Sequence, residues 1–264
     1  MNNLTILLHT SKTMRTPSWH GEPPRTPLLA NKAAELAAYV RTLRPRQLQD
    51  VMHISAPLAA KTHAVLAAWP ADAAQSSLAI DSFVGDIYSG LRASTLTAAD
   101  RDYANQHLRI LSGLYGILCP YDAVRPYRLE MGYKLPDAPY NNLYHFWNTT
   151  IADQLPASGL IINLAAVEYT KAVLPYVDAA RVVTPRFLTA DPKTDEPGFV
   201  VVHTKIARGA FARWLITTRT TDPVQFHAFD DIGYVYIPAL SSPTEPVFVC
   251  RKFGGIGLSM RLTK

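Results

Sequence analysis

Charged side chains follow three apolar segments of the chain, at the point where each segment ends. They are Lys12 after residues 4–9 (LTILLH), Glu168 and Lys171 after residues 160–165 (LIINLA), and Lys205 and Arg208 at the end of residues 199–207 (FVVVHTKIA). Each segment has the composition of a short buried strand, and ligands of parallel sheets gather beyond the carboxyl ends of the strands. Lysines and arginines would bind an anion there, and Glu168 would act as general acid, general base or nucleophile. The pattern therefore predicts an anion pocket with Glu168, Lys171 and Lys12 as candidate catalytic residues.

One interpretation of these residues without catalysis remains open, and one further feature suggests anion binding. Glu168 and Lys171 stand three residues apart on a predicted helix, which also suits an ordinary surface ion pair. Arg208 and Gly209 stand at the expected start of another helix, where backbone N–H groups bind anions. The chain contains no P-loop, no G-x-G-x-x-G and no G-x-S-x-G motif, which disfavours nucleotide sites of those types and a serine hydrolase.

The first half of the chain is predicted to be mostly helical, and the second half to contain both strands and helices. These elements must position the side chains named above. Helices are expected at residues 28–43, from 45, and at 56–69, 98–112, 141–155, 166–174 and 208–219. Strands are expected at residues 4–9, 160–165, 181–189, 199–207, 234–238 and 246–252. With 264 residues, 48% hydrophobic and 18% charged, we expect residues 1–264 to form a single globular domain.

A polar stripe and an uneven charge distribution both suggest a partner that carries phosphate groups. Arg101, Asn105 and Arg109 recur at intervals of four on the predicted helix 98–112, where they would track a phosphate backbone or form a solvated helix face. The net charge is +5, and residues 1–70 hold eight lysines and arginines against three acidic residues. A basic segment of this kind can attract nucleic acid.

Other classes of protein receive little support from the sequence. The two cysteines form no C-x-x-C pair and the eight histidines are dispersed, so neither a metal site nor a cofactor is expected. The apolar run LTILL is too short for a signal sequence, and no stretch reaches roughly 18 consecutive apolar residues. We therefore expect a cytoplasmic protein with no membrane contact, and the sequence leaves its oligomeric state undetermined.

Five blocks of the chain carry a family resemblance. They are residues 83–91 (FVGDIYSGL), 107–132 (HLRILSGLYGILCPYDAVRPYRLEMG), 163–173 (NLAAVEYTKAV), 205–215 (KIARGAFARWL) and 247–252 (VFVCRK). In this order they resemble the YaaA (DUF328, UPF0246) family of bacterial peroxide-stress proteins. The resemblance extends from the N-terminal strand to about residue 252.

The resemblance implies a fold and a partner. The implied fold is α+β, a single two-lobed domain with a mixed sheet, surrounding helices and a positively charged cleft. The implied partner is duplex or junction DNA, bound in part by a helix-hairpin-helix-like element. Carried to this sequence, that element is the helix ending near Ser112 together with the segment SGLYGIL. Gly113 and Gly116 would expose backbone N–H groups to a phosphate, and Tyr115 would stack or pack between them.

The segment RPYRLEMG within the longest block supplies further candidate binding residues. We expect Arg125 and Arg128 to contact phosphate, Tyr127 to offer a flat face to a base, and Glu130 to orient an arginine or move a proton. These side chains would lie at the rim of the cleft that the strand-end residues line, and Arg213 is another predicted binding residue. Alternatively, Arg128 and Glu130 pair with each other to hold a loop.

The chain departs from the family pattern at two positions near the predicted pocket. Residues 9–12 read HTSK where the family pattern has S-P-A-K, so that only Lys12 matches. Val167 stands where a polar residue, often an acid, is expected. The sequence thus leaves three functions: a DNA-binding protein of the peroxide-stress response, a diverged biosynthetic enzyme acting on a nucleotide, nucleobase or similar small anion, and a scaffold without chemistry.

Overall fold

The central sheet has five strands in the order β6-β5-β1-β8-β9. The computed structural model describes residues 4–18, 23–69, 76–136, 139–140 and 142–258. The strands of this sheet are β1 (Leu4–His9), β5 (Leu108–Ser112), β6 (Gly116–Leu118), β8 (Leu160–Asn163) and β9 (Val182–Val183). Neighbouring strands pair in parallel, except that β6 is antiparallel to β5. The predicted combination of a mixed sheet with helices is confirmed.

Strand β1 is the middle strand of this sheet, with β5 on one side and β8 on the other. All six residues of β1 are buried, as expected for an apolar run that both neighbours and both faces cover. Ile6 pairs with Leu108, and Leu4 pairs with Leu160. Because the three strands run in the same direction, the residues after β1 and after β8 emerge at one edge. The strands predicted at residues 4–9 and 160–165 are confirmed.

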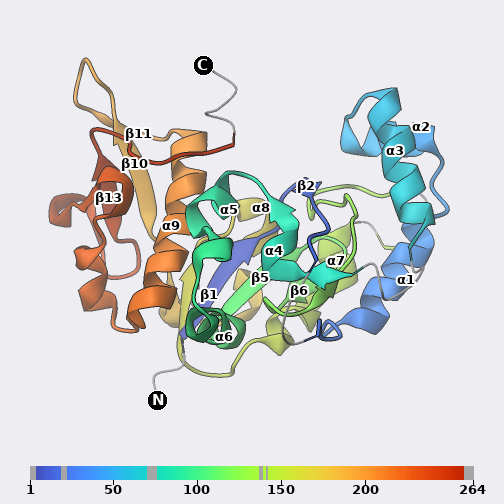
Figure 1. The fold of residues 1–264 in the computed structure, drawn as a ribbon, viewed down its shortest axis with the longest axis horizontal. Helices are drawn as coiled ribbons and strands as arrows, with labels where there is room; N and C mark the ends of the chain where they lie inside the picture. Colours follow the sequence, from blue (N-terminus) through green and yellow to red (C-terminus); the bar gives the residue numbers. More distant parts are fainter. Residues whose placement is uncertain (1–3, 19–22, 70–75, 137–138, 141, 259–264) are drawn as a thin grey trace.

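A second sheet lies beyond helix α9 (Val201–Thr218), on the far side from β1 (Figure 1). Its order is β11-β10-β13-β12. The strands are β10 (Arg186–Ala190), β11 (Pro197–Gly198), β12 (Tyr234–Tyr236) and β13 (Val247–Cys250). Phe187 of β10 packs against Phe211 of α9 and Phe248 of β13, with ring centroids 5.7 and 5.5 Å apart. Helix α9 is therefore fixed to the second sheet by an aromatic core.

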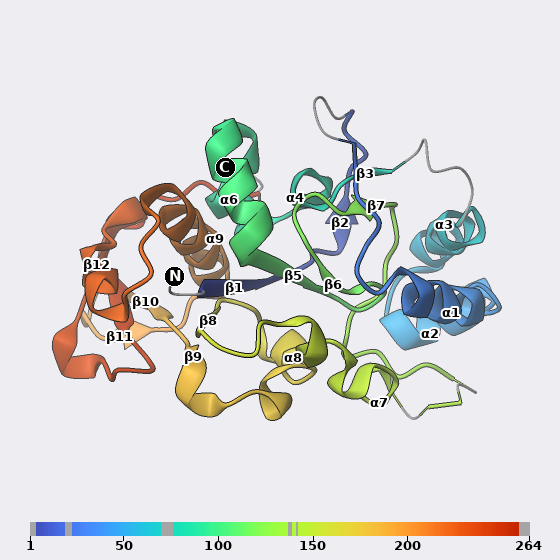
Figure 2. The same cartoon turned by 90° about the horizontal axis from the view of Figure 1, so that it is seen from below.

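Three helices of the first third lie at the opposite end of the molecule from the second sheet (Figure 2). They are α1 (Ala30–Val40), α2 (Pro45–Met52) and α3 (Ala56–Ala67). All three were predicted, and Pro45 at the first position of α2 supplies the fixed φ that a helix start requires. None of the described helices is long and apolar enough to span a membrane.

Short elements connect these layers. The short helices are α4 (Ala79–Ser82), α5 (Asp86–Leu91), α7 (Leu143–Trp147) and α8 (Val167–Thr170). The short strands are β2 (Thr13–Met14), β3 (Ser77–Leu78), β4 (Phe83–Val84) and β7 (Ala123–Val124). The helices predicted at 141–155 and 166–174 are thus much shorter than expected, because 3-10 turns take up part of both segments.

The helix predicted at residues 98–112 is wrong in its second half. Helix α6 (Ala98–His107) begins at the expected cap, where Thr97 and Asp100 bond to each other's backbone N–H. The chain then changes to strand β5, since Leu108, Ile110 and Leu111 are buried beside β1 and pairing there overrides the helical period.

The segment SGLYGIL consequently forms a β-hairpin between β5 and β6, in place of the expected helix-hairpin-helix-like element. Gly116 has a φ of 70°, a conformation that favours glycine at this turn. A Cβ atom at Gly113 would overlap the carbonyl oxygen of Leu129. Both glycines therefore have packing roles within the fold.

The strand predicted at residues 199–207 is also wrong, because helix α9 starts at Val201. The run of valines favours a strand locally, but Thr204, Ala207 and Phe211 recur at helical spacing and all are buried. Lys205 and Arg208 therefore lie inside a long helix, and Gly209 is in its middle, where no free N–H groups are available to an anion.

Helices α5 and α9 cross where each has a glycine. A Cβ atom at Gly90 would overlap the carbonyl oxygen of Ile206, and one at Gly209 would overlap that of Ile87. Neither obstacle is a flexible side chain, so relief would require the two helix backbones to separate. This contact fixes α9 against the segment that follows β4.

We expect Gly90→Ala and Gly209→Ala each to lower the free energy of unfolding by about 2 kcal/mol or more, because overpacking against a backbone cannot relax locally. Chemical denaturation measures the change. Gly198→Ala is the matched control, since its Cβ would meet only the carbonyl oxygen of Thr189 at 3.9 Å. Equal stability of all three variants and the unmodified protein would contradict the close-packing interpretation.

Candidate functional site

A pocket of about 360 Å³ opens at the carboxyl end of β1, and residues of α5, α8 and α9 contribute to its lining. Figure 1 shows where these elements lie. We call this cavity the strand-end pocket. Its polar and charged lining residues are His9, Thr10, Ser11, Lys12, Thr13, Asp86, Glu130, Glu168, Tyr169 and Lys205. These residues come from five separate segments of the chain, and two of the segments, residues 9–13 and 168–169, lie at or just after the ends of the parallel strands β1 and β8 at one edge of the sheet. Of the candidate catalytic residues, Lys12 and Glu168 line the pocket and Lys171 does not.

Lys12 and Glu130 form an ion pair at this pocket, with Nζ 2.9 Å from Oε2. The hydroxyl of Tyr133 donates a hydrogen bond to the same carboxylate oxygen at 3.1 Å. The structure thus pairs Glu130 with Lys12, whereas the alternative predicted from the sequence paired it with Arg128. Arg128 instead donates from Nη1 to the carbonyl oxygen of Lys12 at 3.5 Å.

Glu168 is held by backbone groups. Its Oε1 accepts a hydrogen bond of 2.7 Å from the N–H of Gly132, and its own carbonyl oxygen accepts one of 2.9 Å from the hydroxyl of Tyr144. No described residue donates to its Oε2. Lys171, the C-cap of α8, is exposed and makes no ion pair with Glu168, so the surface pair considered above does not form.

His9, the last residue of β1, is a buried side chain of the pocket, with only 7% of its surface exposed. Its Nδ1 accepts a hydrogen bond of 3.1 Å from the N–H of Ala166, and its ring stacks on Tyr169 with centroids 4.8 Å apart. Burial, followed by the charges of Arg208 and Lys205, lowers the pKa of the imidazole to about 3. His9 is therefore neutral at neutral pH.

Two cations of α9 lie near His9. Lys205 is exposed and lines the pocket, while Arg208 is partly buried. Burial lowers the pKa of the Arg208 guanidinium, and its Nε has no hydrogen-bond partner in the described part of the chain. Both residues belong to the middle of a helix and not, as predicted, to the end of a strand, and of the two only Lys205 lines the pocket.

Buried hydroxyl groups support the inner wall of the pocket. Tyr88 donates to the carbonyl oxygen of His9 at 3.0 Å, and Thr10 donates to the hydroxyl of Tyr169 at 3.3 Å. Burial raises the pKa of both tyrosines, which therefore stay protonated and act as neutral hydrogen-bonding groups. They position the β1 end without adding charge.

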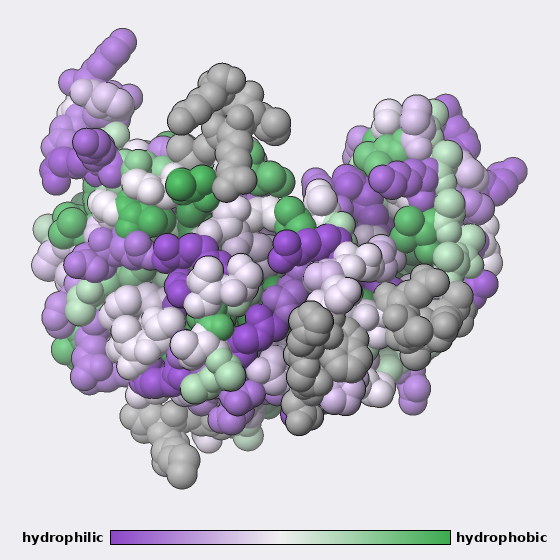
Figure 3. Space-filling view, in the orientation of Figure 1, coloured by the Kyte–Doolittle hydropathy of each residue, from purple (hydrophilic) through white to green (hydrophobic). Residues whose placement is uncertain are grey.

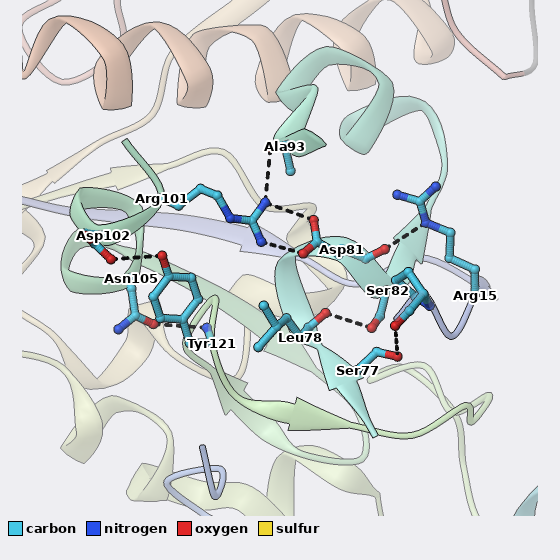
Figure 4. Close-up of polar contacts among 11 residues, drawn as sticks. Arg15, Ser77, Leu78, Asp81, Ser82, Ala93, Arg101, Asp102, Asn105 and Tyr121 are labelled. Atoms are coloured by element: carbon cyan, nitrogen blue, oxygen red, sulfur yellow. Dashed lines mark hydrogen bonds and ion pairs between the residues drawn. The ribbon is translucent and has the colours of Figure 1, made fainter. Parts of the chain in front are cut away.

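The polar stripe predicted to contact phosphate makes contacts inside the protein (Figure 4). The guanidinium of Arg101 forms a bidentate ion pair with the carboxylate of Asp81 and also donates a hydrogen bond to the carbonyl oxygen of Ala93. The side-chain oxygen of Asn105 accepts from the N–H of Tyr121 at 3.0 Å. Figure 4 shows these contacts joining α6 to α4 and to the loop that contains Tyr121.

The remaining predicted binding residues are also engaged by protein groups. Arg109 donates to the carbonyl oxygens of Asn105 and Leu108, and Arg213 donates to those of Leu91 and Arg92. These contacts terminate α6 and α5, which gives both arginines a capping role.

Tyr115 and Tyr127 are almost completely buried, so neither offers an exposed ring face to a base. The hydroxyl of Tyr115 accepts from the backbone N–H of Arg125 at 3.2 Å. The hydroxyls of Tyr127 and Ser112 share a hydrogen bond of 2.6 Å. The RPYRLEMG segment thus places Glu130 at the pocket, whereas Tyr127 of the same segment and Tyr115 of the preceding hairpin belong to the core.

Sequence reasoning missed His9, Thr10, Ser11 and Asp86 as pocket residues. The available signal was the position of His9 at the end of a buried strand, three residues before Lys12. Val167, where a polar residue, often an acid, was expected, is 67% exposed and does not belong to the pocket lining. Among the described residues, no group of three or more histidine, cysteine, aspartate or glutamate side chains is arranged to hold a metal ion.

Comparison with known proteins identifies the family. The model of the family described as "Peroxide stress protein YaaA" matches residues 4–240. A UPF0246 protein of Salinispora tropica is 56% identical over 258 residues, which cover 98% of each chain. A UPF0246 protein of Verminephrobacter eiseniae is 41% identical over 93% of this chain and 97% of its own, and one of Ralstonia pickettii is 41% identical over 86% and 92%. With a full-length match of this kind, the chain belongs to the YaaA (UPF0246) family of peroxide-stress proteins.

Proposed function

We propose that this protein binds a small anionic molecule of nucleotide or nucleobase type in the strand-end pocket, and acts on it during the response to peroxide. The observation that supports this most is the arrangement of lysines from two distant segments, Lys12 and Lys205, around one pocket with three carboxylates, of which Glu130 is paired with Lys12. A pocket of about 360 Å³ is within the usual size range of small-molecule sites. A flat DNA-binding surface would not require this enclosed arrangement.

Glu168 is the group best placed to move a proton in this pocket. Its Oε1 is fixed by the N–H of Gly132, so the carboxylate is held in one orientation, while Oε2 has no donor among the described residues. A fixed carboxylate with one oxygen left for a ligand suits a general base or acid. Lys205, which forms no ion pair with a described residue, would supply the electrostatic stabilisation for charge that develops on an anionic ligand, whereas Lys12 is already paired with Glu130.

Direct reduction of peroxide by a cysteine receives no support from the site. Neither Cys119 nor Cys250 belongs to the described lining of the pocket. Burial raises the pKa of both thiols, which lowers the fraction of reactive thiolate. Membership of the peroxide-stress family is therefore better explained by chemistry on a small anion than by a thiol reaction.

Nucleic-acid binding is the second candidate function, and exposed cations on the first three helices favour it. Arg41, Arg44 and Lys61 are exposed and form no ion pair in the described part of the chain. Figure 3 shows hydrophilic side chains over this end of the molecule. Such a surface suits non-specific contact with phosphates, whereas Arg101 and Arg109 already bind protein groups.

We expect Glu168→Gln to abolish turnover while leaving the fold intact, because glutamine keeps the oxygen that accepts from Gly132 and loses the charge. The measurement is a thermal-shift screen of nucleotides and nucleobases, followed by a turnover assay of each stabilising compound. A ligand at about 100 times its Kd should stabilise the native protein by about 2.7 kcal/mol. Lys193→Gln, an exposed lysine of the β10–β11 turn, is the control. Turnover equal in both variants would contradict the role of Glu168.

The neutral His9 makes stability depend on pH. Since the imidazole pKa is about 3 in the folded protein and about 6.5 when unfolded, only the unfolded state holds its proton between those values. We expect this group to contribute fully above about pH 6.5, and its contribution to fall by about 1.4 kcal/mol per pH unit towards about pH 3. Chemical denaturation of the protein and of His9→Asn at several pH values measures this. Parallel stability curves for the two proteins would show that folding does not change the pKa of His9.

Replacing Arg41, Arg44 and Lys61 together by glutamine should weaken binding of duplex DNA. The slope of log affinity against log salt concentration should also become less steep, by an amount that corresponds to up to about three fewer phosphate contacts. Fluorescence anisotropy at several salt concentrations checks this. The control replaces three exposed cations of the opposite end, Arg186, Lys193 and Lys252, which removes the same charge. Equal loss in both triple variants would indicate a net-charge effect, and unchanged affinity in both would remove this candidate surface.

A further inference from the structure

The two nitrogens of the His9 ring have different surroundings. Nδ1 accepts a hydrogen bond from the backbone N–H of Ala166, and a ring nitrogen that accepts carries no proton. The proton of the neutral imidazole must then be on Nε2. The fold thereby selects one tautomer, because a backbone N–H cannot exchange its donor role for an acceptor role.

Nε2–H of His9 has no acceptor among the described residues, although the side chain is 93% buried and lines the pocket. Nε2 is not one of the fully buried side-chain atoms that lack a partner, so this N–H is accessible from the pocket, and whatever fills that space can accept a hydrogen bond from it. Because Nδ1 is bonded to the wall at Ala166 and the ring face is stacked on Tyr169, Nε2–H is the group that His9 can present to a ligand.

The charged groups around His9 favour an anionic acceptor. The titratable and charged residues of the elements packed against it are Lys12, Asp86, Tyr88, Glu130, Glu168, Tyr169, Lys205 and Arg208. The two groups whose charges act on the imidazole are the cations Arg208 and Lys205. They disfavour a second proton on the ring and attract an oxyanion to the same place.

We infer that His9 donates a hydrogen bond from Nε2–H to an oxyanion of the ligand, a phosphate or carboxylate group, next to the ammonium of Lys205. This inference rests on the proposed function and names the group of the ligand that the inner end of the pocket recognises. His9 is a fixed neutral donor here and does not take up a proton.

The tautomer is tested directly by NMR of protein labelled with ¹⁵N in the histidine rings. The ring signals of His9 are those that disappear in His9→Asn or, if that variant does not fold, in His9→Gln. We expect a neutral ring with the proton on Nε2 from about pH 5 to about pH 8, where an unperturbed histidine would titrate. A proton on Nδ1, or titration to imidazolium in this range, would overturn the inference.

Two variants test the donor role. In His9→Asn the amide oxygen can still accept from Ala166, but no group reaches the position of Nε2, whereas His9→Gln can place an amide donor near that position. The probes are inorganic phosphate, acetate and AMP, and adenosine is the probe without an oxyanion. For each probe that binds, calorimetry should show binding to His9→Asn weakened about tenfold or more, and binding to His9→Gln less affected. Affinity for adenosine should be the same in all three proteins.

The outcomes separate this inference from the proposed function. Binding of phosphate, acetate or AMP that is equally strong in the unmodified protein and in His9→Asn would overturn the role of His9 and leave the anion pocket in place. Binding that weakens in His9→Asn for adenosine as much as for AMP would also overturn it, since the loss would then not concern an oxyanion. If the unmodified protein binds none of the anions, the proposed function fails and the inference fails with it.

Discussion

Parallel pairing of β1 with β5 and β8 is the constraint on which the other features of this protein depend. It buries all six residues of β1 and sends the chain after β1 and after β8 to the same edge of the sheet. The N–H of Ala166 reaches Nδ1 of His9 only because these two strand ends are neighbours. The register of β1 against β8 therefore also determines which groups meet at the pocket. A shift of that register would separate His9 from Ala166.

The charged side chains of the protein divide into two groups with different surroundings. Arg101, Arg109 and Arg213 bind carboxylate or carbonyl oxygens of the protein itself, and these contacts join or terminate helices. At the strand-end pocket, by contrast, Lys205 forms no ion pair with any described residue, and Nε of Arg208 has no hydrogen-bond partner there. Ion pairs inside a fold use up the charge that a ligand would need, so the unpaired cations indicate better than the number of arginines where an anion can bind.

The sequence predicted the strands at residues 4–9 and 160–165 and placed Lys12 and Glu168 at one site. An apolar run indicates a buried strand, and the charged residue that follows it marks the point where the chain leaves the sheet edge. The prediction was wrong at residues 199–207 and 108–112, where valine- and leucine-rich runs suit a strand and a buried helix equally. Tertiary packing decides between them: α9 buries one side of its run against β10, and β5 pairs with β1. His9 escaped notice because a single histidine in an apolar run has no spacing partner, and its importance arises from Ala166, a residue 157 positions away.

The crossing of helices α5 and α9 at Gly90 and Gly209 has a consequence for the width of the strand-end pocket. Helix α5 supplies Asp86 and Ile87 to one wall of the pocket, and α9 supplies Lys205 to another. Since the two helix backbones already touch, the distance between these walls is at its lower limit, and any larger residue at the crossing would push them apart at the cost of the fold. In this protein the spacing of these two walls is therefore set by the fold, and a different ligand would have to be accommodated by changes in the side chains that line the pocket.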